Sequence, residues 1–351
     1  MDSVFNLINS EAIATYWTEE ATNAIPYLGE TLFPARKKLG LDLSWFTGND
    51  GLPVALKPSH FDTKATVRDR IGVSKIETDM PFFRESMLIK EKDRQELLKI
   101  QEGMDTSLYQ DFIERIFNDR KALIDGANVQ AERMRMQLIS TGKIVITANG
   151  VNLEYNFDAD NSFKTNNYTE LQGTSKWSDV DHSDPFEDIQ TIQDRIENLT
   201  GSKPTRLVMS KKVFGYLCKN HKLIKAIQPN FGLDRPVLGS TIREYLETEL
   251  DVTILVYSKK FKNEQGATMS FYPDDRVSFL PASTLGSTWY GTTPEEADLV
   301  AKTGIDVTIV NTGVAVTTLI KEHPVNVETI VSEIVLPSFE QMMEVGILKV
   351  V

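Results

Sequence analysis

Residues 108–142 read LYQDFIERIFNDRKALIDGANVQAERMRMQLISTG. Apolar side chains recur along this stretch every three or four residues, at Tyr109, Phe112, Ile113, Ile116, Leu123, Ala127, Ala131, Met134 and Leu138. Because residues with this spacing lie on one side of an α-helix, the stretch predicts a helix with a continuous apolar stripe. Gly142 follows the last apolar residue and is the predicted C-cap.

The other side of this predicted helix is charged. Asp111, Arg115 and Asp119 follow one another at intervals of four residues, so opposite charges are neighbours on the helix surface. An unbroken helix of about 33 residues would be roughly 50 Å long, several times the usual length in a compact domain. We interpret it as a structural spine. The alternative is two ordinary helices joined near Gly126-Ala127-Asn128.

The composition sets limits on the class of protein. The chain has 351 residues, enough for two or three domains, and its 41% hydrophobic and 25% charged residues are ordinary for a globular protein. A formal charge of -12 argues against a surface built mainly to grip nucleic acid. Cys218 is the only cysteine, which excludes an internal disulfide. We expect no membrane-spanning segment and no secretion signal.

The first 50 residues predict a helix followed by an irregular arm. The helix is expected over Ser10–Asn23. The arm is interrupted by proline and glycine and carries the apolar residues Leu32, Phe33, Leu39, Leu41, Trp45 and Phe46. Because such an arm cannot bury these side chains alone, we expect it to lie across its own subunit's core or across a neighbour.

Residues 52–90 show the alternation of polar and apolar residues that is typical of strands, with Gly72 as a turn. The segment carries many charges of both signs and little apolar material. A long two-stranded flap of this kind is marginal in isolation, so we expect a second chain to support it. The alternative is a solvated hairpin at a sheet edge.

Local signals predict the remaining elements. Residues 90–101 predict a short charged helix, and Asn149-Gly150 predicts a hairpin between two alternating segments. Residues 158–184 are polar and lack a pattern, which suggests a linker. From Pro185 to about residue 310, helices and strands alternate as in an α/β domain. The strands after residue 311 are expected to rejoin the spine helix.

Motifs for catalysis are largely missing. The sequence contains no Walker, dinucleotide-binding, nucleophile-elbow or zincin motif. The best metal candidate combines Asp179, Asp181, His182 and Asp184, which offer hard oxygens and one imidazole. The alternative is an acidic surface segment in which Asp184 caps the following helix. The sequence therefore predicts no catalytic residue, no cofactor and no metal site.

The order of the elements and several local strings resemble the major capsid protein of tailed bacteriophages, in the lambda-type branch called capsid protein E. The strings are Leu138-Ile-Ser-Thr-Gly142-Lys143 running into the Asn149-Gly150 hairpin, Trp177-Ser178 with Asp184-Pro185, and Phe271-Tyr-Pro-Asp-Asp275 followed by Gly286. Each string is moderately specific, and the resemblance extends in order over nearly the whole chain.

The resemblance implies an α+β, HK-97-like phage capsid fold in four parts. The N-terminal arm would be 1–51 and the extended E-loop 52–90. The peripheral domain would combine 91–160, which includes the spine helix, with 311–351. The axial domain would be 161–310.

The resemblance further implies a structural protein without enzymatic activity, which self-assembles into pentamers and hexamers of an icosahedral shell around double-stranded DNA. An encapsulin-like nanocompartment shell and, from another class, a metal-dependent enzyme are the alternatives. The expected partners are the chain itself, a separate scaffolding protein, a portal, optionally a decoration protein, and packaged DNA through weak non-specific contacts. We expect no membrane partner. Assembly would occur in the host bacterial cytoplasm, with the protein ending in the virion.

The resemblance also selects residues for contacts between subunits. In the E-loop they are Arg68, Asp69, Arg70, Lys75, Glu77, Arg84 and Glu85. In the arm they are Phe33, Trp45 and Phe46. In the axial loop they are Asn230, Asp234 and Arg235. Charge reversal at both Arg68 and Arg70 is expected to leave a folded subunit that assembles poorly.

Overall fold

The computed structural model describes residues 9–21, 26–47, 74–102, 106–148, 150–230, 236–299, 306–323 and 325–351. The chain divides into two compact units, each built from three segments. Unit 1 comprises Met1–Leu43, Glu77–Glu132 and Ser287–Ser338, and unit 2 comprises Ser44–Ile76, Arg133–Gly286 and Phe339–Val351. The four-part division inferred from the resemblance concerns the subunit in a shell and stays a prediction.

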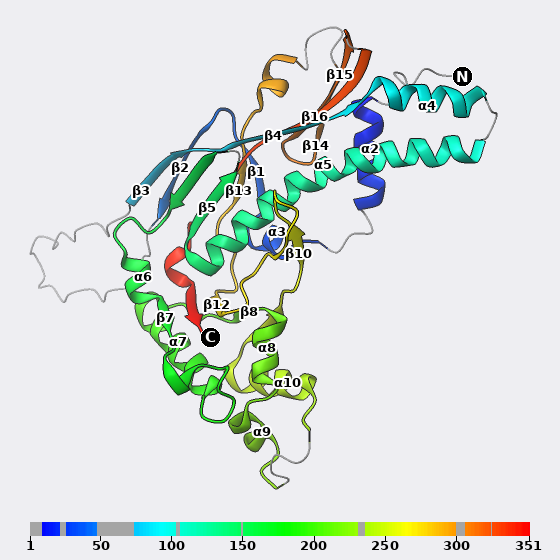
Figure 1. Cartoon of the computed structure of the whole chain (residues 1–351). Coiled ribbons are helices and arrows are strands. Elements are labelled where there is room, and N and C mark those ends of the chain that lie inside the picture. Colours follow the sequence, from blue (N-terminus) through cyan, green and yellow to red (C-terminus); the bar gives the residue numbers. More distant parts are fainter. Residues whose placement is uncertain are drawn as a thin grey trace, which may run out of the picture. The chain divides into compact units, whose positions relative to one another are not determined.

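The spine prediction is confirmed. Helix α5 runs unbroken over Thr106–Thr141, 36 residues (Figure 1), so the alternative of two helices joined near Gly126 is wrong. Gly142 adopts φ +73, and its N–H donates to the Leu138 carbonyl at 2.8 Å, which ends the helix in the predicted manner. The last nine residues of α5 belong to unit 2 and the rest to unit 1.

Unit 1 is built on a six-stranded sheet. Five strands follow the order β1-β13-β16-β15-β14, and β4 pairs with the other side of β16. Their bounds are β1 Ala35–Lys37, β4 Phe82–Ile89, β13 Thr288–Tyr290, β14 Asp306–Val310, β15 Val314–Glu322 and β16 Val325–Pro337. The long β15–β16 pair confirms the two extended limbs expected in this part of the chain.

Helices α2 (Ser10–Ala21) and α5 share a core with one face of this sheet. Ile13 from α2, Ile124 from α5 and Val316 from β15 are almost fully buried there. Each such side chain contributes about 1.5–3 kcal/mol by leaving water. Trp17 adds a directional contact, because its Nε1–H donates to Asp125 Oδ1 at 2.8 Å.

The N-terminal arm is more ordered than predicted. It contains helix α3 (Leu28–Leu32), strand β1, and β2 (Asp42–Thr47), which pairs with β3 (Ser74–Asp79). The buried carboxylate of Glu132 accepts a hydrogen bond from the Gly29 N–H at 3.1 Å, at the first turn of α3. A carboxylate at this position satisfies a helix-terminal donor and complements the helix dipole.

Unit 2 is built on a five-stranded sheet in the order β7-β17-β12-β8-β9. The strands are β7 Tyr168–Glu170, β8 Arg206–Met209, β9 Thr253–Val256, β12 Arg276–Leu280 and β17 Gly346–Lys349. The helices are α7 Pro185–Thr200, α8 Lys211–Leu217, α9 His221–Ile227 and α10 Gly239–Leu250. Apolar residues of α7, α8 and α10 form one core with β8, β9 and β12, so the predicted alternation of helices and strands is confirmed.

The predicted linker over 158–184 is wrong. This segment contains α6 (Ser162–Asn166), β7 and a 3-10 turn, η1 (Gly173–Ser175). Strand β7 pairs in parallel with β17, so the last strand of the chain lies in this sheet. Trp177 is fully buried and donates through Nε1 to Asp188 Oδ2 at 2.9 Å. Burial of Trp177 and pairing with a distant strand hold in place a segment that has no repeating pattern.

Shorter elements complete the chain. Hairpin β5–β6 (Lys143–Ala148 and Val151–Asn156) and helix α4 (Glu91–Glu102) confirm two local predictions. A second hairpin joins β10 (Lys260–Lys262) and β11 (Thr268–Ser270). A π-helix η2 covers Glu295–Leu299, and a 3-10 turn η3 covers Met342–Glu344. Within the ranges described above, no helix is both long enough and apolar enough to cross a bilayer.

Candidate assembly surfaces

The candidate E-loop residues fall into two groups. Arg68, Asp69 and Arg70 lie outside the described residues, and of Lys75 only the backbone in β3 is described. Glu77, Arg84 and Glu85 are exposed. Glu77 lies on β3 and the other two lie on β4, which pairs with β16 along its whole length. The described part of the predicted E-loop, strands β3 and β4, therefore pairs with strands of its own chain.

Arg84 is bound within its own subunit. Its guanidinium lies 2.5 Å from Glu295 Oε1 and 4.7 Å from the centre of the Phe82 ring. Glu295 is buried, and its second carboxylate oxygen accepts from the Ser332 hydroxyl at 2.8 Å. Because a buried carboxylate needs a partner of opposite charge, Arg84 serves to neutralise Glu295 in this structure. Nothing in the sequence around Glu295 indicated this pair.

The arm residues selected as contacts lie inside the subunit. Phe33 is fully buried, and its carbonyl accepts from the Thr288 hydroxyl at 2.9 Å. Trp45 is also buried, with its ring centre 5.3 Å from that of Phe157. The side chain of Phe46 lies outside the described residues. Phe33 and Trp45 therefore anchor the arm to its own chain and, in this conformation, offer no surface to a neighbour.

Other residues of the arm do present apolar surface. Leu39 is 85% exposed and Leu41 is 48% exposed, in the turn between β1 and β2. The Leu41 carbonyl accepts from the Met80 N–H at 3.0 Å, and Phe82, two residues further on, is 42% exposed. We call Leu39, Leu41 and Phe82 the arm patch. Large apolar side chains grouped on a surface are typical of sites that pack against another protein.

The axial loop is described only at its edges. Asn230 is exposed just beyond α9, and Asp234 and Arg235 lie outside the described residues. Leu238, at the N-cap of α10, is 72% exposed. The described flanks of this loop therefore carry both polar and apolar surface.

In the acidic segment considered as a metal site, two aspartate side chains contact histidine rings. His182 Nδ1 lies 2.9 Å from Asp179 Oδ1, and His221 Nδ1 lies 2.6 Å from Asp181 Oδ1. Asp184 caps α7 by accepting from the Glu187 N–H. Among the described residues, no three histidine, cysteine, aspartate or glutamate side chains are placed to hold a metal ion together.

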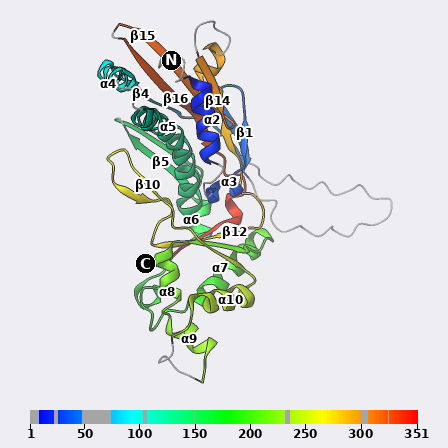
Figure 2. The same cartoon turned by 90° about the vertical axis from the view of Figure 1, so that its right-hand side faces the viewer.

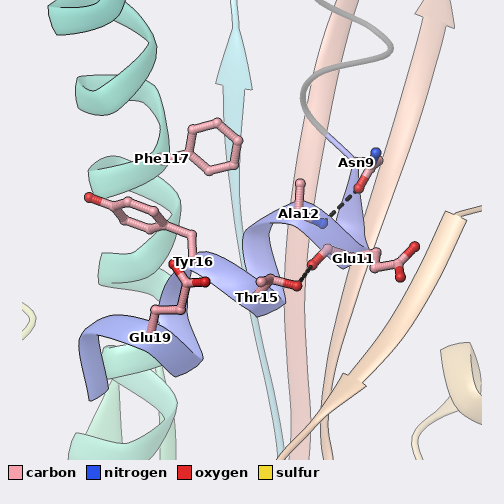
Figure 3. A pocket seen from close by; sticks show the side chains of 7 residues that line it. All are labelled: Asn9, Glu11, Ala12, Thr15, Tyr16, Glu19 and Phe117. Atoms are coloured by element: carbon pink, nitrogen blue, oxygen red, sulfur yellow. Dashed lines mark hydrogen bonds between the residues drawn. The ribbon is translucent and has the colours of Figure 1, made fainter. Parts of the chain in front are cut away.

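A surface pocket of about 430 Å³ lies on α2, beside α5 in unit 1 (Figure 3). The rings of Tyr16 and Phe117 form one side, with centres 5.4 Å apart, and the Tyr16 hydroxyl donates to Asn118 Oδ1 at 2.9 Å. The rest of its lining consists of Asn9, Glu11, Ala12, Thr15 and Glu19. No imidazole, thiol or amine is among these lining residues.

Three solved structures share this architecture at low sequence identity. A protein described as a candidate prophage capsid protein of Escherichia coli CFT073 is 15% identical, with a TM-score of 0.61 over 98% of this chain and 99% of that one. A phage-related protein of Bordetella bronchiseptica RB50 is 13% identical, with a TM-score of 0.54 over 97% of each chain. A chain of the cyanophage A-1(L) capsid is 9% identical, with a TM-score of 0.53 over 92% of each chain. The fold is therefore α+β and HK-97-like, as the resemblance implied.

The sequence comparison gives the family. None of the curated proteins compared with the chain matches it significantly. The model of the family described as phage major capsid protein E matches residues 10–349, which is nearly the full length. The same match disfavours the encapsulin-like alternative. This chain therefore belongs to the phage major capsid protein E family.

Proposed function

We propose that this chain is the major capsid protein of a tailed phage and that its copies form the pentamers and hexamers of a closed icosahedral shell around double-stranded DNA. The family match over residues 10–349 carries this proposal. The chain contributes surfaces to an assembly, and we expect it to turn over no substrate.

The surface of the single subunit supports an assembling protein. The arm patch leaves three large apolar side chains in water, of which Leu39 is 85% exposed. Interfaces that are permanent commonly bury more than about 2,000 Å², and their centres are apolar. Closed symmetry repeats each contact many times, so a shell is stable even when a single contact is weak.

Further partners follow from this function. We propose that a separate scaffolding protein directs assembly, that a portal occupies one vertex, and that a decoration protein is an optional outer partner. The packaged DNA would touch the inner surface through weak, non-specific contacts, in keeping with the overall charge of -12. Assembly would take place in the host cytoplasm, and the product is the virion head.

Negative-stain electron microscopy of the overexpressed full-length protein tests the proposal. Closed shells, tubes or capsomer rings are the expected result. Co-expression with the scaffolding protein and portal should make the particles uniform in size, whereas a nanocompartment would form uniform particles alone. Material that stays unassembled even with both partners present would contradict the proposed function.

A further inference from the structure

The hairpin formed by β10 (Lys260–Lys262) and β11 (Thr268–Ser270) has two different faces. Lys260 pairs with Ser270 and Lys262 with Thr268 in its register. Because alternate residues of a strand point to the same side, these four side chains share one face. All four residues are exposed. We call this face, with its two ammonium and two hydroxyl groups, the lysine face. Figure 2 shows the hairpin, labelled β10, extending away from α8 and α10 of the same unit.

The opposite face holds the hairpin in place. The Phe261 ring lies 4.8 Å from that of Phe271. The guanidinium of Arg133, from the last part of α5, lies 5.7 Å from the centre of the Phe261 ring and 2.7 Å from Glu264 Oε1 in the hairpin turn. Both contacts lie within unit 2. They fix the ribbon against its own unit, and they pair the one carboxylate of the turn with an arginine.

The charge on the lysine face is uncompensated. Neither Lys260 nor Lys262 forms an ion pair or a side-chain hydrogen bond within the described part of the chain, and Glu264 already has Arg133 as its partner. In a chain with a net charge of -12, two adjacent ammonium groups on a face without carboxylates form a local positive site. Threonine and serine hydroxyls beside them can donate hydrogen bonds to the same anion.

We propose that the lysine face contacts phosphate groups of the packaged DNA, an inference that rests on the proposed function. Ammonium groups bind phosphate as point charges, and hydroxyl groups help to position it. The face carries no amide or guanidinium group that could read base edges in pairs, so the contact is independent of sequence. A single copy would bind weakly, but a shell presents the same face many times. Each contact can still release the DNA when the genome leaves.

Fluorescence anisotropy of a labelled 20-base-pair duplex, titrated with full-length protein between 20 and 150 mM NaCl, tests this inference. Each phosphate contact contributes about 0.9 to the slope of log affinity against log salt concentration. The double variant K260Q/K262Q should therefore lower that slope by about 1.8. The matched control K211Q/K212Q removes the same charge from two exposed lysines at the start of α8 and should leave the slope unchanged.

Three results would overturn the inference. They are undetectable binding by the natural protein at 20 mM salt, an unchanged slope in K260Q/K262Q, and an equal loss in both double variants. Circular dichroism checks folding. If K260Q/K262Q is unfolded, K262Q alone should lower the slope by about 0.9. K260R/K262R, which keeps both positive charges, should have the slope of the natural protein. Electron microscopy of the same samples separates this inference from the proposed function. If K260Q/K262Q forms shells and binds DNA like the natural protein, the role of the lysine face is refuted and the proposed function is not.

Discussion

At the scale of single residues, the buried carboxylates of Glu132 and Glu295 have partners that lie far away in the sequence. Glu132 accepts from the Gly29 N–H, and Glu295 is held by Arg84. The half-buried carboxylate of Asp188 accepts a hydrogen bond from the Trp177 indole, and its partial burial raises the pKa of Asp188 despite that hydrogen bond. A buried charge without a partner would destabilise the fold by several kcal/mol, so these contacts stabilise the folded chain. Pairs separated by many residues leave no local pattern, which is why they were missed.

Arg84→Ala should destabilise the protein, because it removes the positive charge that neutralises the buried carboxylate of Glu295 and leaves the Ser332 hydroxyl bonded to it. We expect a loss of about 2 kcal/mol in the free energy of unfolding. Urea denaturation of the purified subunit measures it. Glu85→Ala, a neighbouring exposed residue of β4, is the control and should change stability by less than about 0.5 kcal/mol. Equal effects in the two variants would contradict the role given to Arg84.

Asp275 predicts a pH dependence of stability. Hydrogen bonds from the Arg276 side chain, at 2.7 and 3.0 Å, hold the pKa of Asp275 below its ordinary value. A carboxylate with a lowered pKa stabilises the fold above its ordinary pKa, and this contribution is lost as the pH falls through the folded-state pKa. Asp275→Asn should therefore be less stable than the natural protein at pH 7, by about 1 kcal/mol, and this gap should close toward pH 3. Urea midpoints measured from pH 3 to 7 test it, and a gap that does not change with pH would contradict the assignment.

At the scale of elements, local sequence patterns predicted the helices and hairpins that are formed by interactions between residues close in sequence. Helix α5, hairpin β5–β6 and the N-cap of α7 at Asp184 follow from periodicity, a turn dipeptide and a capping residue. Strands β1 and β7 were missed because each has three residues and pairs in parallel with a strand far along the chain. A three-residue strand carries too little alternation to be recognised.

The residues predicted to contact other subunits show the same limit of local sequence patterns. An apolar residue in an arm must be buried somewhere, but the sequence does not say in which subunit. Phe33 and Trp45 are buried in their own chain, whereas Leu39 and Leu41 remain exposed. The choice depends on contacts such as Thr288 with Phe33, which lie 255 residues apart.

Glu132→Ala should loosen the arm from the rest of unit 1. The variant removes the acceptor for the Gly29 N–H at the start of α3, at a cost of about 1–3 kcal/mol for the unsatisfied buried donor. Trypsin should then cut faster in β1, whose residues Arg36 and Lys37 are exposed. Timed digestion with mass spectrometry measures the rate. Glu114→Ala, on the exposed side of α5, should be cut like the natural protein. Unchanged cleavage in Glu132→Ala would show that other contacts hold the arm.

At the scale of the whole molecule, the arm patch should matter for assembly and not for folding. Leu39→Asp with Leu41→Asp replaces exposed apolar side chains by charges, so the subunit should unfold at the same urea concentration within error. Shell formation should fall strongly, because two charges in an apolar interface carry a desolvation cost. Particle yield by gradient centrifugation measures this. The matched control is Leu199→Asp on α7, and equal losses in both variants would argue against a specific role for the arm patch.

The central claim is that this chain is a building block that completes its structure by packing against copies of itself. Sedimentation velocity of the purified full-length protein over a hundredfold range of concentration tests it most directly. We predict that capsomers and larger particles replace the monomer as concentration rises. A single species with the mass of one 39.6 kDa chain at every concentration would contradict the claim.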